Sequence, residues 1–140
     1  MLTQAQIIPL LLERCPEFAP VWEEYQRGPT ASSAIYIDVA EFVHLLVNSY
    51  EQGKLELLPR AFKAVEDLFI EGDSTVREIA ALGILESLQS AASWKPFGKK
   101  AFIPFLGPKS LAAWNEIEII WRGKSSLMDV IRAENKSDKR

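Results

Sequence analysis

The stretch that decides the fold is IYIDVAEFVHLLVNSYEQ, residues 35–52, which Gly53 follows directly. Eleven of the sixteen residues from Ile35 to Tyr50 are apolar, too many for a helix with one wet face. The polar residues recur every three or four positions and so fall on one narrow stripe of a helix: Asp38, Glu41, His44, Asn48 and Glu51. We therefore expect a central helix that packs on most of its circumference, with Gly53 in a left-handed conformation just past its end.

Length and composition predict one soluble globular domain, residues 1–140, with a tail at 134–140 that frays. Apolar residues make up 48% of the chain and charged residues 25%, which is ordinary for such a domain. No window of eighteen residues is apolar and uncharged, and we expect no membrane span or membrane partner. Because Cys15 is the single cysteine, an internal disulfide is excluded, and a reducing, cytoplasmic location is expected.

Charge is divided unevenly along the chain. Residues 1–93 hold fourteen acids and six bases, a net charge of −8, whereas residues 94–140 hold ten bases and five acids, a net charge of +5. An acidic body of this kind repels nucleic acid and attracts a basic protein surface. The alternative is that these charges only solvate helix faces, and the sequence leaves both interpretations open.

Turn residues and capping patterns divide the rest of the chain into further helices. The predicted helices cover residues 3–14, 16–27, 57–70, 75–89, 99–106 and 108–122, with a last one after Gly123. No stretch alternates apolar and polar residues for long enough to form a strand. The prediction is an all-α, single-domain bundle of about six to eight helices.

The two helices at 57–70 and 75–89 are predicted to form a hairpin. Asp73, Val76, Arg77 and Ala80 resemble the D-x-x-V-R-x-x-A signature of HEAT-type repeats, in which the aspartate caps the second helix. Only one copy is present, which favours a HEAT-like hairpin within a bundle over a solenoid. Gly83 lies in the same helix, and a neighbouring helix packed closely against it would explain a glycine there.

The residues that carry enzyme chemistry are sparse. Cys15 and His44 are single, without the paired spacing of a metal site, and Glu41-x-x-His44 is only half of a di-iron helix motif. No nucleophile elbow and no phosphate-binding loop is present. We expect no catalytic residue, no metal and no cofactor, and therefore a protein that is not an enzyme.

Nucleic-acid binding is a weaker alternative. Basic and aromatic residues interleave in one short region: Trp94, Lys95, Phe97, Lys99, Lys100 and Phe102. These aromatic residues lie among prolines and glycines, where they serve more easily as loop anchors, and we expect Trp94 to pin its loop to the body. The pI of about 5.3 also argues against a nucleic-acid partner.

Residues 16–89 carry a family resemblance, in the segments PEFAPVWEEY and YIDVAEFVHLLVNSYEQGKLELLPRAFKAVEDLFIEGDSTVREIAALGILESLQ. They resemble a family of small all-helical bacterial proteins that accompany polymorphic or contact-dependent growth-inhibition toxins as immunity proteins. The resemblance implies a helical fold and a cognate toxin domain as the partner. It supplies no binding residues that can be transferred to this chain.

Resemblance and charge together predict a non-enzymatic inhibitor that covers the basic face of a toxin domain, expected to be a nuclease. The predicted contacts are acids expected on exposed stripes: Asp38, Glu41, Glu66, Asp67, Glu71 and Asp73. The loop at residues 28–33 is a second candidate. A general helical adaptor or regulatory subunit is the alternative, and the oligomeric state is left open.

Overall fold

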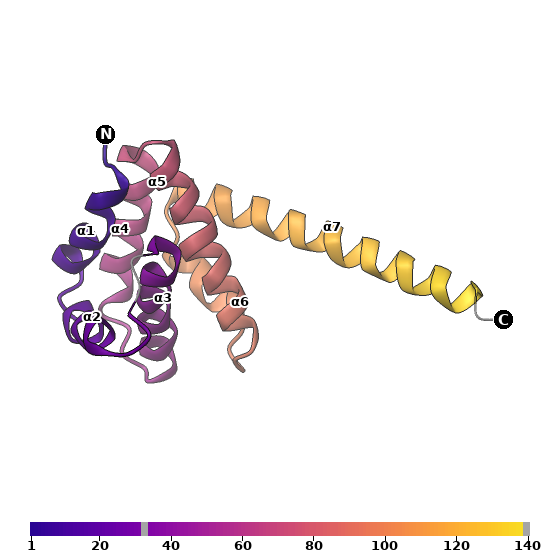
Figure 1. Ribbon diagram of the computed structural model, residues 1–140, viewed down its shortest axis with the longest axis horizontal. Helices are drawn as coiled ribbons and strands as arrows, with labels where there is room; N and C mark the ends of the chain where they lie inside the picture. The colour runs from indigo at the N-terminus through magenta and orange to yellow at the C-terminus, as the bar shows by residue number, and fades with distance from the viewer. Residues whose placement is uncertain (32–33, 139–140) are drawn as a thin grey trace.

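In the computed structural model, residues 1–31 and 34–138 are described, and loops join helices in this part of the chain, with no strand among them. Seven α-helices form a bundle (Figure 1), as the sequence predicts. The elements in chain order are η1 (Gln4–Gln6), α1 (Ile7–Arg14), α2 (Phe18–Arg27), α3 (Ile35–Glu51), α4 (Leu58–Glu71), α5 (Ser74–Glu78), η2 (Ile79–Glu86), α6 (Ser87–Ser93), η3 (Lys99–Phe105) and α7 (Pro108–Asp138).

Helix α3 occupies the centre of the bundle, as its composition predicts. It packs against α1, α2, η2 and α6, and its apolar residues from Val39 to Val47 line the core. His44, Asn48 and Glu51 reach solvent along the expected seam. Gly53 follows the helix with φ +75°, a conformation that a glycine adopts without a steric penalty.

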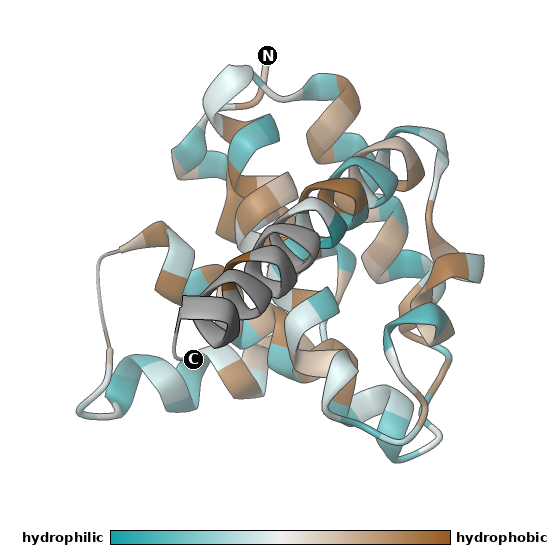
Figure 2. Cartoon of the chain, turned by 90° about the vertical axis from the view of Figure 1, so that its right-hand side faces the viewer, coloured by the Kyte–Doolittle hydropathy of each residue, from teal (hydrophilic) through white to brown (hydrophobic). Residues whose placement is uncertain are grey.

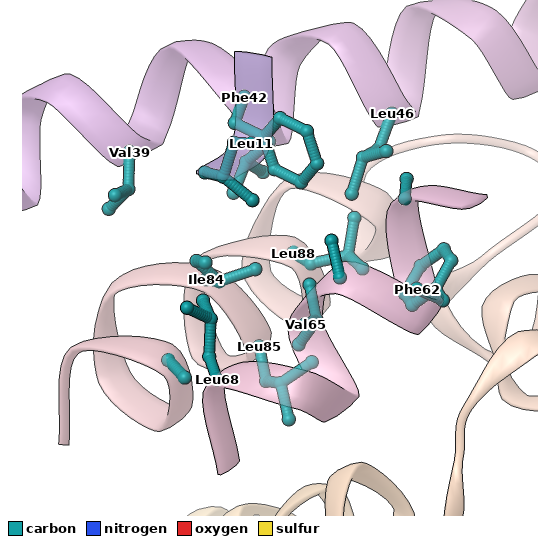
Figure 3. Close-up of a cluster of buried hydrophobic side chains, with 14 of the residues drawn as sticks. Leu11, Val39, Phe42, Leu46, Phe62, Val65, Leu68, Ile84, Leu85 and Leu88 are labelled. Atoms are coloured by element: carbon teal, nitrogen blue, oxygen red, sulfur yellow. The ribbon is translucent and has the colours of Figure 1, made fainter. Parts of the chain in front are cut away.

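The core is one continuous cluster of apolar side chains from most of the helices. Figure 3 shows Phe42 and Leu46 of α3 facing Phe62 and Val65 of α4, with Leu88 of α6 among them. All five side chains are fully buried. Such a cluster is the main source of stability for a chain of this size, because burial of apolar surface is the dominant favourable term in folding.

The predicted hairpin forms between α4 and the continuous helix made by α5, η2 and α6. Asp73 caps α5 by accepting a hydrogen bond from the backbone N–H of Val76 at 2.9 Å. In the π-helical segment η2, a Cβ on Gly83 would lie 3.0 Å from Val39 and 3.1 Å from Tyr36 of α3. The close approach of a neighbouring helix that Gly83 predicts is therefore confirmed.

Helix α7 corrects one boundary. The sequence predicts a helix end at Gly123, but α7 continues through that residue to Asp138 and extends away from the bundle (Figure 1). A glycine inside a helix costs only about 1 kcal/mol, which does not compel a break. Figure 2, seen from the C-terminal end of α7, shows hydrophobic positions on this helix. Ile119 and Ile120 of α7 are 63% and 56% exposed. The last two residues of the predicted frayed tail, Lys139 and Arg140, lie outside the described residues.

The expectation that Trp94 pins its loop to the body is wrong. It is 86% exposed and does not anchor its loop. Phe97 and Phe102 do that instead, since their rings lie 4.6 and 5.3 Å from the ring of Tyr50. With the loop already held by these contacts, the indole of Trp94 is left in solvent.

Candidate functional site

The six predicted contact carboxylates do not form one exposed flank, and Asp38 is the first exception. It is 9% exposed, and its Oδ1 accepts a hydrogen bond of 2.9 Å from the hydroxyl of Tyr25. This bond links α3 to α2. The expectation that Asp38 lies exposed is wrong, because the α2–α3 packing covers the start of the polar stripe.

Glu66 is buried as well, and it organises the start of α7. Its carboxylate accepts hydrogen bonds from the N–H groups of Lys109 and Ser110 at 3.0 and 2.9 Å, and from the Ser110 hydroxyl at 2.9 Å. A Cβ on Gly107 would lie 2.6 Å from this carboxylate, so only glycine leaves room for it. Burial raises the pKa of Glu66, but these hydrogen bonds outweigh that effect and hold the pKa below its usual range.

Asp67 is the third buried acid. Its carboxylate lies 2.8 Å from Arg14 of α1 and 3.0 Å from Lys63 of its own helix. Burial raises the pKa of Asp67, and the hydrogen bonds from Lys63 and Arg14 more than offset this and lower it. Asp67 and Glu66 therefore join helices to one another, and neither lies exposed as predicted.

The remaining three acids are more accessible: Glu71 and Asp73 are close together at the α4–α5 turn, and Glu41 lies on α3. Glu71 is exposed at the end of α4, and Asp73 is half-buried in its capping position. Glu41 lies on α3, half-buried, with its carboxylate 3.8 Å from Nδ1 of His44. Glu41 borders a surface groove of about 780 Å³. Glu66 and Asp38 line smaller hollows of about 590 and 390 Å³, but their carboxylates are engaged in internal hydrogen bonds.

That groove, the α2–α3 groove, has a volume of about 780 Å³ and an apolar floor from Val21, Leu45 and Leu57. The size falls within the range typical of ligand and peptide sites. One side comes from α2, where the lining residues Val21 and Glu24 are three apart, and the other from α3, where Glu41, Leu45 and Asn48 also recur at helical spacing. The groove thus arises where two amphipathic stripes meet.

Carboxylates border this groove, and only one of them is fully neutralised. Glu17 pairs with Arg60 through two hydrogen bonds, which lower the pKa of Glu17. Glu24 is exposed, and no salt bridge to it is found among the described residues. Glu41 faces His44 at a distance that is long for a strong ion pair. Lys54 also lines the groove, so Glu24 and Glu41 leave it with a net negative charge of about one beside the paired Glu17. Together with the apolar lining, this suits a ligand with both positive charge and apolar surface.

The loop predicted as a second contact region also reaches this groove. Gly28 and Thr30 lie in its lining, beside the carboxyl end of α2. Ser32 and Ser33 of the same loop lie outside the described residues. The structure therefore brings together one of the six predicted acids, Glu41, and part of the predicted loop. It adds Glu24, which the sequence did not single out.

Cys15 is buried in the core. Burial raises the pKa of the Cys15 thiol to about 11, which leaves almost no thiolate at neutral pH. Among the residues described, no three His, Cys, Asp or Glu side chains gather as a metal site would require. No helix of this part combines the length and apolar character that a bilayer span needs.

The fold defines a small all-α protein, and its α2–α3 groove is open and bordered by glutamates, His44 and Lys54. Comparison of sequences places it within a family. A family model for a domain of unknown function, DUF7674, matches residues 8–122, and the chain belongs to this family. The match begins in α1, covers α2 to η3, and ends near the middle of α7. No curated protein and no solved structure matches the chain significantly.

Proposed function

We propose that this protein is a non-enzymatic immunity protein that binds a cognate bacterial toxin domain in the cytoplasm and covers its basic face. The observation that carries the proposal is the α2–α3 groove, where Glu24 and Glu41 border an apolar floor. A toxin that acts on nucleic acid needs a basic surface, and an acidic groove complements that surface in charge. The family resemblance of residues 16–89 supplies the biological setting.

The burial of three predicted acids narrows this proposal to the groove. Asp38, Glu66 and Asp67 are engaged inside the protein and cannot reach a partner without loss of their internal bonds. Charged partners attract one another mainly through exposed groups, which speed the encounter and fix the orientation. The binding contribution is therefore expected from Glu24 and Glu41.

The test compares two double charge reversals in cells that express a candidate toxin domain. Glu24→Lys with Glu41→Lys changes the groove, and Glu71→Lys with Glu78→Lys makes the same charge change on exposed acids outside it. We expect the groove variant to lose protection and to bind the toxin at least about a hundredfold more weakly, since two attractive charges become repulsive and like charges placed against each other cost several kcal/mol. The variant with Glu71→Lys and Glu78→Lys, here called the hairpin variant, should protect like the wild type.

Opposite results would redirect the proposal. Loss of protection only in the hairpin variant would place the contact at Glu71, as the sequence first suggested. Retention of protection and affinity by both variants would exclude charge-guided capture. If the wild-type protein does not bind the toxin and does not relieve its toxicity, the adaptor alternative is favoured.

A further inference from the structure

A second groove lies in the corner between α6, η3 and α7, and it shares no residue with the α2–α3 groove. Its volume is about 350 Å³, and its lining consists of Gln89, Ser90, Ser93, Trp94, Lys99 and Trp121. The helices that meet there are fixed by the fold, since Gln89 of α6 is hydrogen-bonded to the backbone of Trp114 in α7. We call it the tryptophan corner.

Two tryptophans from different elements expose their rings at this corner. Trp94, which follows α6, is 86% exposed, and Trp121 of α7 is 46% exposed. Singly exposed hydrophobic side chains are normal, whereas exposed ones that gather on one surface mark a place where other apolar surface binds. Indole faces bind planar rings in stacked or edge-to-face geometry.

Gln89 gives the corner a polar element of defined direction. The residue is 4% exposed, and its Nε2 donates to the carbonyl oxygen of Trp114 at 3.1 Å. This bond fixes the amide orientation and makes Oε1 the remaining acceptor. Oε1 is buried and accepts no hydrogen bond within the described part of the chain. Buried acceptors are normally satisfied, so the wall of the corner offers a place for a donor. Because Oε1 has almost no accessible surface, a donor bonds to it only when side chains at the rim move aside.

Lys99 narrows the ligand chemistry further. Its Nζ lies 3.8 Å from Oε1 of Glu118, and that same oxygen accepts a hydrogen bond from the indole N–H of Trp114 at 3.2 Å. The lysine charge is thus partly balanced, which argues against a phosphate or carboxylate as the main ligand group. The ammonium group of Lys99, beside a groove that could hold a ring, favours an electron-rich aromatic ring through a cation–π contact.

We propose that the tryptophan corner binds an electron-rich aromatic ring that carries a hydrogen-bond donor, namely a phenol or an indole. The ring contacts Trp94 and Trp121, and its O–H or N–H donates to Oε1 of Gln89. Two sources offer this chemistry, a free aromatic compound or a tyrosine or tryptophan side chain in a peptide. The inference is independent of the toxin-binding proposal.

The test titrates the ¹⁵N-labelled protein with N-acetyl-L-tyrosinamide and, as a matched control, N-acetyl-L-phenylalaninamide, which lacks only the hydroxyl. The four tryptophans give separate indole N–H signals in an NMR spectrum, so the site of binding is read directly. We expect saturable shifts at Trp94 and Trp121, and a Kd about fivefold to tenfold lower for the tyrosine amide, the factor associated with one hydrogen bond. Equal affinities, shifts confined to Trp22 or Trp114, or no saturable shift would each overturn the proposal.

Two variants locate the contacts. Trp94→Ala should weaken the tyrosine amide at least about tenfold, whereas Ile70→Ala, which removes a 56% exposed apolar side chain elsewhere, should leave its Kd unchanged. Gln89→Met should erase the difference between the two amides. If Gln89→Met does not fold, the comparison of the two amides on the wild-type protein still decides the question.

A last comparison separates the two sources. p-Cresol presents the phenol ring alone, and the peptide Gly-Gly-Tyr-Gly-Gly presents it on a backbone. Tighter binding of the peptide would assign the corner to a protein segment, and tighter binding of p-cresol would assign it to a free aromatic compound. Failure of both to bind would refute the site, without any bearing on protection against a toxin.

Discussion

Glu66 and Glu41 have the same side chain but play two different roles in the structure. Both are glutamates in the acidic body, and the sequence assigned both to the same exposed flank. Glu66 accepts three hydrogen bonds from the start of α7 and is 6% exposed, whereas Glu41 lies on the wall of an open groove beside His44. The difference is that one carboxylate joins two helices and the other remains available to a partner. Net charge along the chain therefore overstates the charge that the surface can use.

The largest effect expected from this comparison is on stability at Glu66. Glu66→Gln places an amide donor against the N–H groups of Lys109 and Ser110, and the free energy of unfolding should fall by about 2 kcal/mol. Chemical denaturation measures this change. The control is Glu71→Gln at an exposed position, which should stay within about 0.5 kcal/mol of the wild type. Equal stability of the two variants would mean that the cap of α7 contributes nothing.

A smaller effect should appear in acid. The folded protein holds the pKa values of Glu66 and Asp67 below their usual 4.5 and 3.8, so the unfolded chain takes up protons first as the pH falls. Their contribution to stability is complete above about pH 4.5 and is lost as the pH falls through the lowered folded-state values. Unfolding curves between pH 6 and pH 3 test this. Glu66→Gln should lose stability less steeply in that range than the wild type, and an identical slope would contradict the assignment.

The smallest effect on stability is expected at the groove. Glu24→Gln and Glu41→Gln remove carboxylates that the fold does not use, and each should change the free energy of unfolding by no more than about 0.5 kcal/mol. Denaturation of the two single variants and the double variant provides the measurement. If either substitution lowered the free energy of unfolding by more than about 1 kcal/mol, that carboxylate would have a structural role like that of Glu66. The case for the groove as a binding site would then be weaker.

Much of the fold followed from local patterns in the sequence. The density of apolar residues in α3 predicted a central helix, Gly53 predicted its end, and Asp73 with Val76 predicted the cap of α5. These features depend on neighbours within a few residues, where helical geometry is nearly fixed. Gly123 misled the prediction because a glycine ends a helix only when another conformation is favoured more.

The candidate site was predicted less well. The polar stripe of α3 was recognised, and with it Glu41, but Glu24 was not, although Val21, Glu24 and Gly28 lie on one side of α2. A stripe on one helix does not reveal which other stripe it faces. The buried position of Glu66 depends on Ser110, forty-four residues away, and no local pattern predicts that contact.

The sequence by itself determined that the chain is helical, where most helices begin and end, and which helix is central, because these follow from backbone preferences and from the spacing of apolar residues. Only the tertiary structure decided which charges are buried, which two stripes form a groove, and that Trp94 stands in solvent. The physical reason is that the environment of a side chain is set by residues distant in the chain. A carboxylate becomes a helix cap or a binding group according to what packs beside it.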